Sequence, residues 1–198
     1  MVLTTAEGTV HAGTVVLRAD AWTNRLLAPL GAGVPLRVMQ EQVTYLGPPR
    51  PEAFAPGRFP VWIWDGDVCF YGFPTYGEPT VKAARDVSEL LTDPDRRTFV
   101  PDPGRLEQPS TFMSTTLPGS GPALRTVTCQ YTLTPDRDFV IDRVPGHPGL
   151  LLGLGAAHAF KFTPTFGRVL ADLATTGTSE EDLSLFRADR PALAALAA

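Results

Sequence analysis

The pattern of apolar and polar positions predicts an unbroken apolar strand, a glycine-bearing turn and an amphipathic helix near the end of the chain. The strand is the leucine run at 150–152, and the turn covers residues 153–162. Residues 163–174 then repeat apolar side chains with helical spacing. These side chains are Phe166, Val169, Leu170 and Leu173. Gly177 follows as the expected C-terminal cap of this helix.

Alternating patterns upstream predict a sheet of mostly antiparallel strands. Residues 36–46 alternate over a long stretch, which is typical of one long strand. Residues 61–64 and 67–71 flank Asp65-Gly66 and indicate a hairpin, with a break expected at Gly72. Further strands are expected at 124–133 and 139–142.

The first 31 residues contain only short apolar stretches. Their pattern predicts a small hairpin at 8–13, a strand at 14–19 and a helix capped by Asp20 or Thr23 and ended by Gly31. Residues 85–122 are polar and rich in proline, so only short helical turns are expected there, near Pro94 and Pro103. These elements together predict an α+β fold with a mixed α/β pattern.

Composition narrows the class of protein. The chain has 198 residues, of which 43% are apolar, so it can bury a sizeable core. Its net charge of −4 argues against a nucleic-acid partner. No apolar run is long enough to cross a membrane, and the first residues lack the pattern of a signal peptide, so a cytoplasmic protein without a membrane partner is expected. His11, His147 and His158 are scattered, and Cys69 and Cys129 form no cluster, so no metal site is expected.

Several short motifs follow one another along the chain, which are Ala21-Trp-Thr-Asn, Tyr71-Gly-Phe-Pro followed by Lys82, Cys129-x-Tyr131, Phe139-Val-Ile-Asp, His158-Ala-Phe-Lys161 and the ending Asp189-Arg-Pro. Together they resemble the sarcosine oxidase and N-methyltryptophan oxidase family of flavin-dependent amine oxidases. Their order and spacing match the C-terminal half of that family. The resemblance implies FAD as cofactor, with residues 1–35 ending the FAD domain, 36–122 forming the substrate domain and 123–198 returning to the FAD domain, which is Rossmann-like. The G-x-G-x-x-G turn that opens such FAD domains is absent, so a fragment is expected, with a separately encoded N-terminal half as a candidate partner.

The resemblance also assigns roles to individual residues. Lys82 matches a lysine that promotes reaction with O₂, and Lys161 matches one near the flavin and the substrate carboxylate. Cys129 matches the cysteine that carries the flavin in the covalent members. Tyr71 and Tyr131 match substrate-pocket aromatics. The remaining cofactor-binding positions implied by the match are Gly155, Ala157, His158 and Phe160.

A structural explanation stands beside each of these roles. Lys82 could be a solvated loop lysine and Lys161 a surface lysine, although a lysine at the start of a helix meets the positive end of the helix dipole. Cys129, Tyr71 and Tyr131 lie on predicted strands, where core packing is an ordinary explanation. One departure is visible: Asp86 stands where some family members have histidine, which puts sarcosine itself in doubt.

The expected function is oxidation of a secondary amine or N-methyl amino acid, a small molecule, by hydride transfer to FAD, with O₂ reduced to H₂O₂. Two alternatives stay open, which are an inactive fragment that needs its missing half and a small-molecule binding module. The residues alone support only a ligand-binding corner, so the enzymatic expectation depends on the family resemblance.

Overall fold

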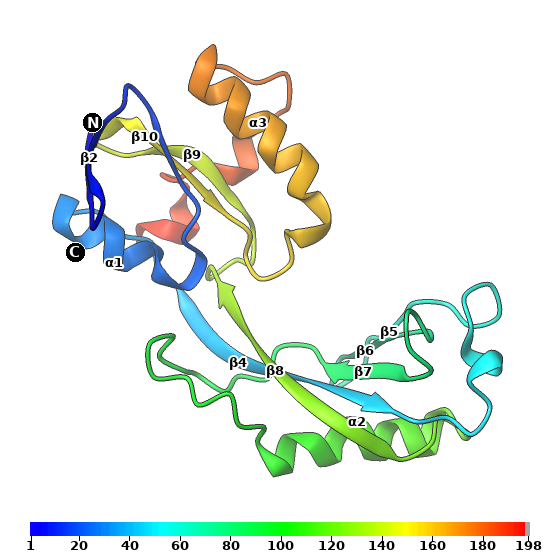
Figure 1. Ribbon diagram of the computed structural model, residues 1–198. Helices are drawn as coiled ribbons and strands as arrows, with labels where there is room; N and C mark the ends of the chain where they lie inside the picture. Colours follow the sequence, from blue (N-terminus) through cyan, green and yellow to red (C-terminus); the bar gives the residue numbers. More distant parts are fainter. Residues whose placement is uncertain (197–198) are drawn as a thin grey trace. The chain divides into compact units, whose positions relative to one another are not determined.

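In the computed structural model, which describes residues 1–196, the apolar leucine run lies in the middle strand of a three-stranded sheet (Figure 1). That strand is β10 (His147–Leu154), which pairs in parallel with β3 (Val15–Leu17) and antiparallel with β9 (Val140–Val144). A strand with neighbours on both sides and cover on both faces needs apolar side chains at every position. The unbroken run of leucines follows from this position.

Both faces of this sheet are buried, each by a different cluster. Leu151 of β10 and Ile141 of β9 pack against α3 (Thr163–Thr175), which contributes the buried Phe166, Val169 and Leu170. The opposite face packs against a second cluster. Its buried members are Leu27, Val34, Val140, Val144, Leu150, Leu152, Leu154 and Leu193. The helix predicted at 163–174 is therefore confirmed, and Gly177 follows its end with a positive φ of 85°.

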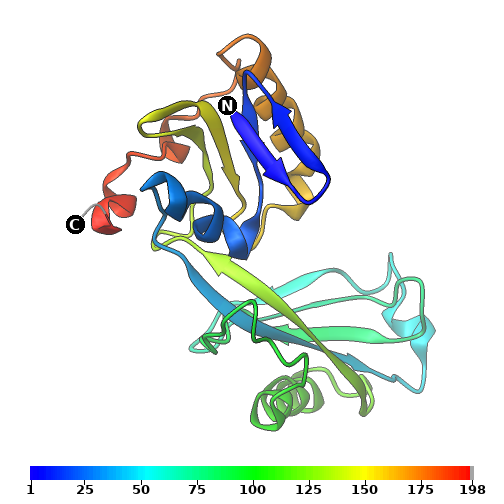
Figure 2. The ribbon, with the colours of Figure 1, turned by 60° about the vertical axis from the view of Figure 1, so that its left-hand side comes forward.

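The N-terminal segment forms the other parts of this unit. The hairpin lies earlier in the chain than the predicted residues 8–13: β1 (Val2–Thr5) pairs antiparallel with β2 (Gly8–His11), so residues 8–11 form only its second strand (Figure 2). The expected helix is short, with α1 (Thr23–Leu27) between the single turns η1 (Asp20–Trp22) and η2 (Ala28–Leu30). Neither Asp20 nor Thr23 is its cap: the N-cap position belongs to Trp22, which supplies no side-chain bond. Gly31 ends the segment with φ 67°, as expected.

Contacts divide the chain into two units, and each is described by itself. Unit 1 joins Met1–Val38 to the chain from Thr132 onward, and unit 2 is Met39–Tyr131. The second boundary between these compact units lies after Tyr131. The reason is that β8 (Ala123–Leu133) pairs with β4 (Arg37–Leu46), so most of β8 belongs to the sheet of unit 2.

Unit 2 is a five-stranded sheet in the order β5-β6-β7-β4-β8 (Figure 1). Its hairpin of β5 (Trp62–Trp64) and β6 (Phe70–Phe73) confirms the predicted hairpin but has a longer loop than Asp65-Gly66. Gly72 does not break the strand. It lies inside β6 opposite Trp62, where a Cβ would come within 2.5 Å of the carbonyl oxygen of Lys82.

Two elements of unit 2 differ from the prediction. Lys82 lies on a strand, β7 (Val81–Arg85), and not in a loop. The second is α2 (Pro103–Thr116), which is a 14-residue helix rather than a short turn. Asp102 caps it by accepting the Arg105 N–H at 3.1 Å, and Pro109 lies inside it. An internal proline argues against a helix in the sequence, which explains the wrong prediction.

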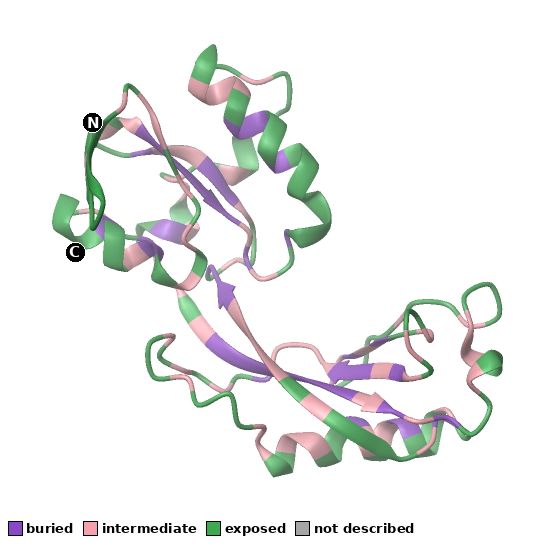
Figure 3. Cartoon of the chain, viewed as in Figure 1, coloured by how far each residue is buried: buried purple, intermediate pink, exposed green. Residues whose placement is uncertain are grey.

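The helix α2 covers one face of the sheet of unit 2. Met113 is fully buried against Leu46, Val81 and Ala83, which alternate with the residues of the other face. Phe112 stacks on Phe70 with ring centres 4.5 Å apart. Figure 2 views α2 almost end-on, and Figure 3 shows the buried positions along the central strands.

The helices and sheets confirm the α+β fold class. Among the helices described in residues 1–196, none has the length and apolar character needed to cross a membrane.

Candidate functional site

The residues singled out in the sequence fall into both units. Unit 1 holds the turn residues Gly155, Ala157, His158, Phe160 and Lys161, and unit 2 holds Tyr71, Lys82, Cys129 and Tyr131. Each group forms a local arrangement of its own.

The turn of unit 1 has an unusual backbone. Ala156 and Ala157 have φ angles of 42° and 72°, in the left-handed region that side chains other than glycine seldom adopt. Gly155 is needed for a different reason, because a Cβ there would lie 2.5 Å from the Cβ of Ala159. The turn is therefore closely packed and holds a strained conformation, of a kind that often occurs at binding sites.

The side chains of His158, Phe160 and Lys161 are exposed, whereas Ala156 and Ala159 are buried. The His158 Nε2 lies 3.2 Å from the carbonyl oxygen of Arg137, and the Lys161 ammonium donates to the carbonyl oxygen of His158 at 3.0 Å. Phe160 is 93% exposed. Among the described residues, no side chain caps the start of α3, which has Phe162 at its N-cap. The Thr163 N–H donates to the carbonyl oxygen of Phe160, and Pro164 has no N–H, so the first two positions of α3 offer no donor to a ligand.

Cross-strand register gathers the unit 2 residues on one face of its sheet. Tyr71 lies opposite Ala84, and Phe73 lies opposite Lys82, which in turn lies opposite Tyr45. Residues that are opposite in an antiparallel pair, or two apart on one strand, point to the same face. Tyr71, Phe73, Lys82 and Tyr45 therefore share the face away from α2.

The edge strand β8 continues this face. The hydroxyls of Thr44 and Thr126 lie 3.3 Å apart, and the Arg125 guanidinium lies 3.6 Å from the centre of the Tyr45 ring. Since one residue number falls as its partner rises, β4 and β8 are antiparallel. Alternation from Arg125 places Cys129 and, two residues further, Tyr131 on the face of Tyr45.

The two tyrosines meet on this face. The hydroxyl oxygens of Tyr71 and Tyr131 are 3.4 Å apart. Burial, with their mutual proximity, raises the pKa of Tyr71, and burial raises that of Tyr131. Both phenols are therefore neutral hydrogen-bonding groups at ordinary pH.

Lys82 has a different neighbourhood on the same face. Its Nζ lies 4.8 Å from the centre of the Phe73 ring. It lines a cavity of about 470 Å³ whose walls include Tyr45, Phe73 and Tyr76. An ammonium group among aromatic rings is suited to hold a small anion or an electron-rich ligand.

A buried carboxylate that the sequence analysis did not single out lies on this sheet. Glu41 of β4 is 2% exposed, and both of its carboxylate oxygens accept the Ser88 N–H, at 2.9 and 3.0 Å. The Ser88 hydroxyl donates to the carbonyl oxygen of Gln40 at 2.6 Å, and Arg105 donates to the Ser88 carbonyl. Burial raises the pKa of Glu41. A charged residue within the buried part of a predicted strand was the signal that could have identified it.

The register also separates the two cysteines. The Cys69 carbonyl accepts the Asp86 N–H at 2.9 Å, which places Cys69 beside β7, whereas Cys129 lies on β8. β4 stands between these strands. Cys69 directly precedes β6, which is three strand spacings, or about 14 Å, from β8, and a disulfide needs Cα atoms within about 7 Å. The two cysteines accordingly form no disulfide with each other.

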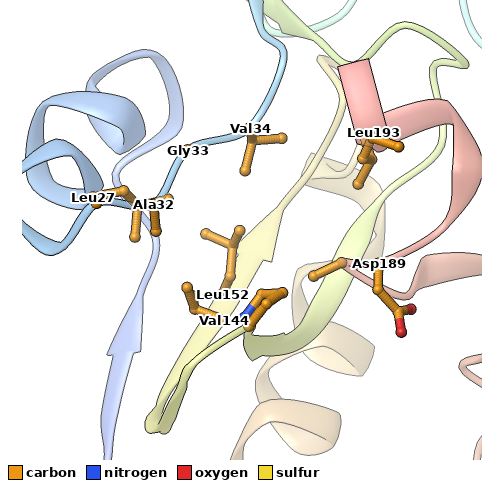
Figure 4. A pocket seen from close by; sticks show the side chains of 12 residues that line it. Leu27, Ala32, Gly33, Val34, Val144, Leu152, Asp189 and Leu193 are labelled. Carbon is orange, nitrogen blue, oxygen red and sulfur yellow. The ribbon is translucent and has the colours of Figure 1, made fainter. Parts of the chain in front are cut away.

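Unit 1 contains a separate apolar cavity of about 370 Å³ (Figure 4). Leu27, Val34, Leu152 and Leu193 point into it from different elements, with Asp189 at its side. It includes none of the residues that the sequence predicted to bind a cofactor or substrate.

A sequence model described as FAD dependent oxidoreductase matches residues 1–173. The chain belongs to this family. Within the FAD dependent oxidoreductases, it is 36% identical over 199 residues to a monomeric sarcosine oxidase of Streptomyces avermitilis, covering 96% of this chain and 51% of that protein. It is 32% identical to the human peroxisomal sarcosine oxidase, covering 94% of this chain and 50% of that protein.

A solved structure agrees with the assignment to the FAD dependent oxidoreductases. The structure of NikD, an amino acid oxidase essential for nikkomycin biosynthesis, aligns with a TM-score of 0.74 and 30% identity, over 94% of this chain and 50% of NikD. The family resemblance found in the sequence is thus confirmed. The chain spans about half the length of the curated relatives it matches.

Proposed function

We propose that this chain is the C-terminal half of an FAD-dependent oxidoreductase that oxidises a secondary amine or N-methyl amino acid. The observation that supports this best is the shared sheet face of Tyr71, Lys82, Cys129 and Tyr131, opposite α2. These are the residues for which the sarcosine oxidase resemblance implies substrate, oxygen and flavin roles. A common face is what such roles require, since they must act on one bound molecule.

Each unit, taken by itself, carries groups that fit FAD as a cofactor. In unit 1, the turn from Gly155 to Phe160, followed by the exposed Lys161, leads into α3. In unit 2, Cys129 supplies a half-buried thiol and Lys82 a cation. FAD, when bound, supplies the electron acceptor for the amine and passes the electrons to O₂. We propose further that Cys129 is the residue to which the flavin is attached.

The chain's own residues would then bind and orient the reactants. The neutral Tyr71–Tyr131 pair can donate and accept hydrogen bonds to a small polar substrate without adding charge. The Lys82 ammonium would stabilise negative charge that develops on O₂ as it is reduced. Lys161 would pair with a substrate carboxylate by exchanging its bond to the His158 carbonyl oxygen.

The second candidate is a fragment that is inactive until a separately encoded N-terminal half joins it, or a small-molecule binding module. The half-length match to the relatives is the observation that favours it. In that case the chain would bind a small molecule in the cavity beside Lys82 without oxidising it.

An anaerobic flavin-reduction assay distinguishes these candidates. The chain mixed with FAD is titrated with sarcosine and a series of N-methyl amino acids, and the loss of flavin absorbance is followed before O₂ is admitted. We expect a secondary amine to bleach the flavin and O₂ to restore it with release of H₂O₂. Lys82→Met should slow the O₂ step at least about tenfold while sparing reduction, whereas Arg125→Met, on the same face two strands away, should not. Bound flavin that no secondary amine bleaches would refute the amine-oxidising role.

A further inference from the structure

Glu41 and Cys129 lie on neighbouring strands, β4 and β8, and on the same face of the sheet of unit 2. The pairs Thr44–Thr126 and Tyr45–Arg125 define the antiparallel register of β4 and β8. Three residues further along, the same register places Glu41 directly opposite Cys129. Side chains of such a pair have Cβ atoms only about 4.5–5.5 Å apart.

The Ser88 N–H keeps this carboxylate in place, because it bonds both oxygens. Cations approach the thiol from other elements. The Arg97 guanidinium donates to the Thr128 carbonyl oxygen at 2.5 Å and to the Thr128 hydroxyl at 2.9 Å, one residue from Cys129. The charged and titratable groups near Cys129 are Glu41, Lys82, Asp86, Arg97, Tyr71 and Tyr131.

We propose that Glu41 controls the reactivity of Cys129, holding it as a neutral, slowly reacting thiol until the carboxylate is neutralised. Like charges opposed across a strand pair are unfavourable, so an ionised Glu41 disfavours a thiolate directly across from it. Burial raises the pKa of the Cys129 thiol most, the charge of Glu41 raises it further, and Arg97 and Lys82 act in the opposite direction. A bound cation beside Glu41 would therefore make Cys129 a better nucleophile, whatever electrophile it meets.

Alkylation by iodoacetamide tests this proposal without any cofactor. The thiolate sulfur forms the new bond to carbon, iodide leaves, and the thiol proton goes to water. Cys69→Ser removes the other thiol, and the alkylation rate of the full chain is measured against pH by mass spectrometry. In this background, Glu41→Gln should lower the midpoint of the pH profile by about one unit, which makes alkylation about tenfold faster near neutral pH. Arg97→Gln should move the midpoint upward.

The alkylation rate at high pH, where Cys129 is fully ionised, distinguishes an effect of the Glu41 charge from an increase in the exposure of the thiol. Glutamine cannot accept the Ser88 N–H with both atoms, so the variant could also loosen the segment and raise the rate at every pH. Glu41→Asp keeps the charge and should keep the midpoint, and Glu107→Gln, on the helix covering the other face, is the matched control. An unchanged or raised midpoint in Glu41→Gln, or a faster plateau with the same midpoint, would overturn the proposal. The outcome does not depend on whether the chain takes up FAD.

Discussion

The ion pair between Asp136 and Arg190 should contribute measurably to the stability of unit 1. The Arg190 Nε and Nη2 donate to both Asp136 oxygens at 2.7 and 2.9 Å, and Nη1 donates to the carbonyl oxygen of Phe139 at 2.8 Å. The side chains are only 10% and 23% exposed for Arg190 and Asp136. The pair joins the segment after η5 (Ser184–Phe186) to the chain that leads into β9.

The lowered pKa of Asp136 gives the size of the contribution of this ion pair to the free energy of unfolding. The hydrogen bonds from Arg190 lower this pKa from 3.8 to about 2, and a full conversion of that shift is about 2.4 kcal/mol. Partial exposure screens the pair, so we expect about 1–2 kcal/mol. Because the folded-state pKa lies below the unfolded value, the contribution is complete above the unfolded pKa and is lost as the pH falls through about 2.

Urea unfolding of the chain and of Asp136→Asn, followed by circular dichroism over a series of pH values, tests this estimate. The free-energy difference should be about 1–2 kcal/mol near neutral pH and should shrink towards zero at the acid end. Asp189→Asn, which breaks an exposed pair with Arg187, is the matched control and should leave stability unchanged. A difference that stays constant down to the lowest pH would show that packing, and not charge, is responsible, and would refute the reasoning.

Two further predictions concern the backbone. Gly72→Ala should destabilise unit 2 by about 2 kcal/mol or more, because the added Cβ would lie 2.4 Å from the Trp62 ring. Gly13→Ala, with open space around it, is the control and should be tolerated. Thermal unfolding measures both variants, and equal melting temperatures would contradict the close packing at Gly72. Ala157→Gly should stabilise the chain by up to about 1 kcal/mol, because φ is 72° there; a loss of stability in urea would contradict this.

The sequence predicted correctly those helices and strands whose apolar pattern reflects burial alone. The leucine run of β10 and the apolar repeat of α3 reflect burial that depends on local periodicity, and both are correct. Tertiary context decides the rest. Val81–Arg85, with two alanines, has little strand preference of its own, but it pairs with β6 and β4 on either side. The helix α2 forms despite Pro109, with an Asp102 cap and a buried Met113.

The sequence predicted which residues belong to the candidate site, but it did not predict how they are arranged in space. A family resemblance identified Tyr71, Lys82, Cys129 and Tyr131, but their common face follows only from strand register, which the sequence alone does not define. Glu41 was missed for the same reason. It becomes notable once β8 is known to lie beside β4, which brings residues far apart in sequence into opposition.

Flavin binding is the central claim, and an absorbance spectrum tests it directly. The purified chain is mixed with FAD, freed of unbound cofactor, scanned in the visible range and then precipitated with acid. We expect flavin bands on the chain, with colour that remains in the acid precipitate of the wild type and leaves it in Cys129→Ser. Flavin released by acid from both proteins would keep the cofactor and remove the covalent attachment. A folded chain that takes up no flavin would contradict the proposal that these residues hold FAD by themselves.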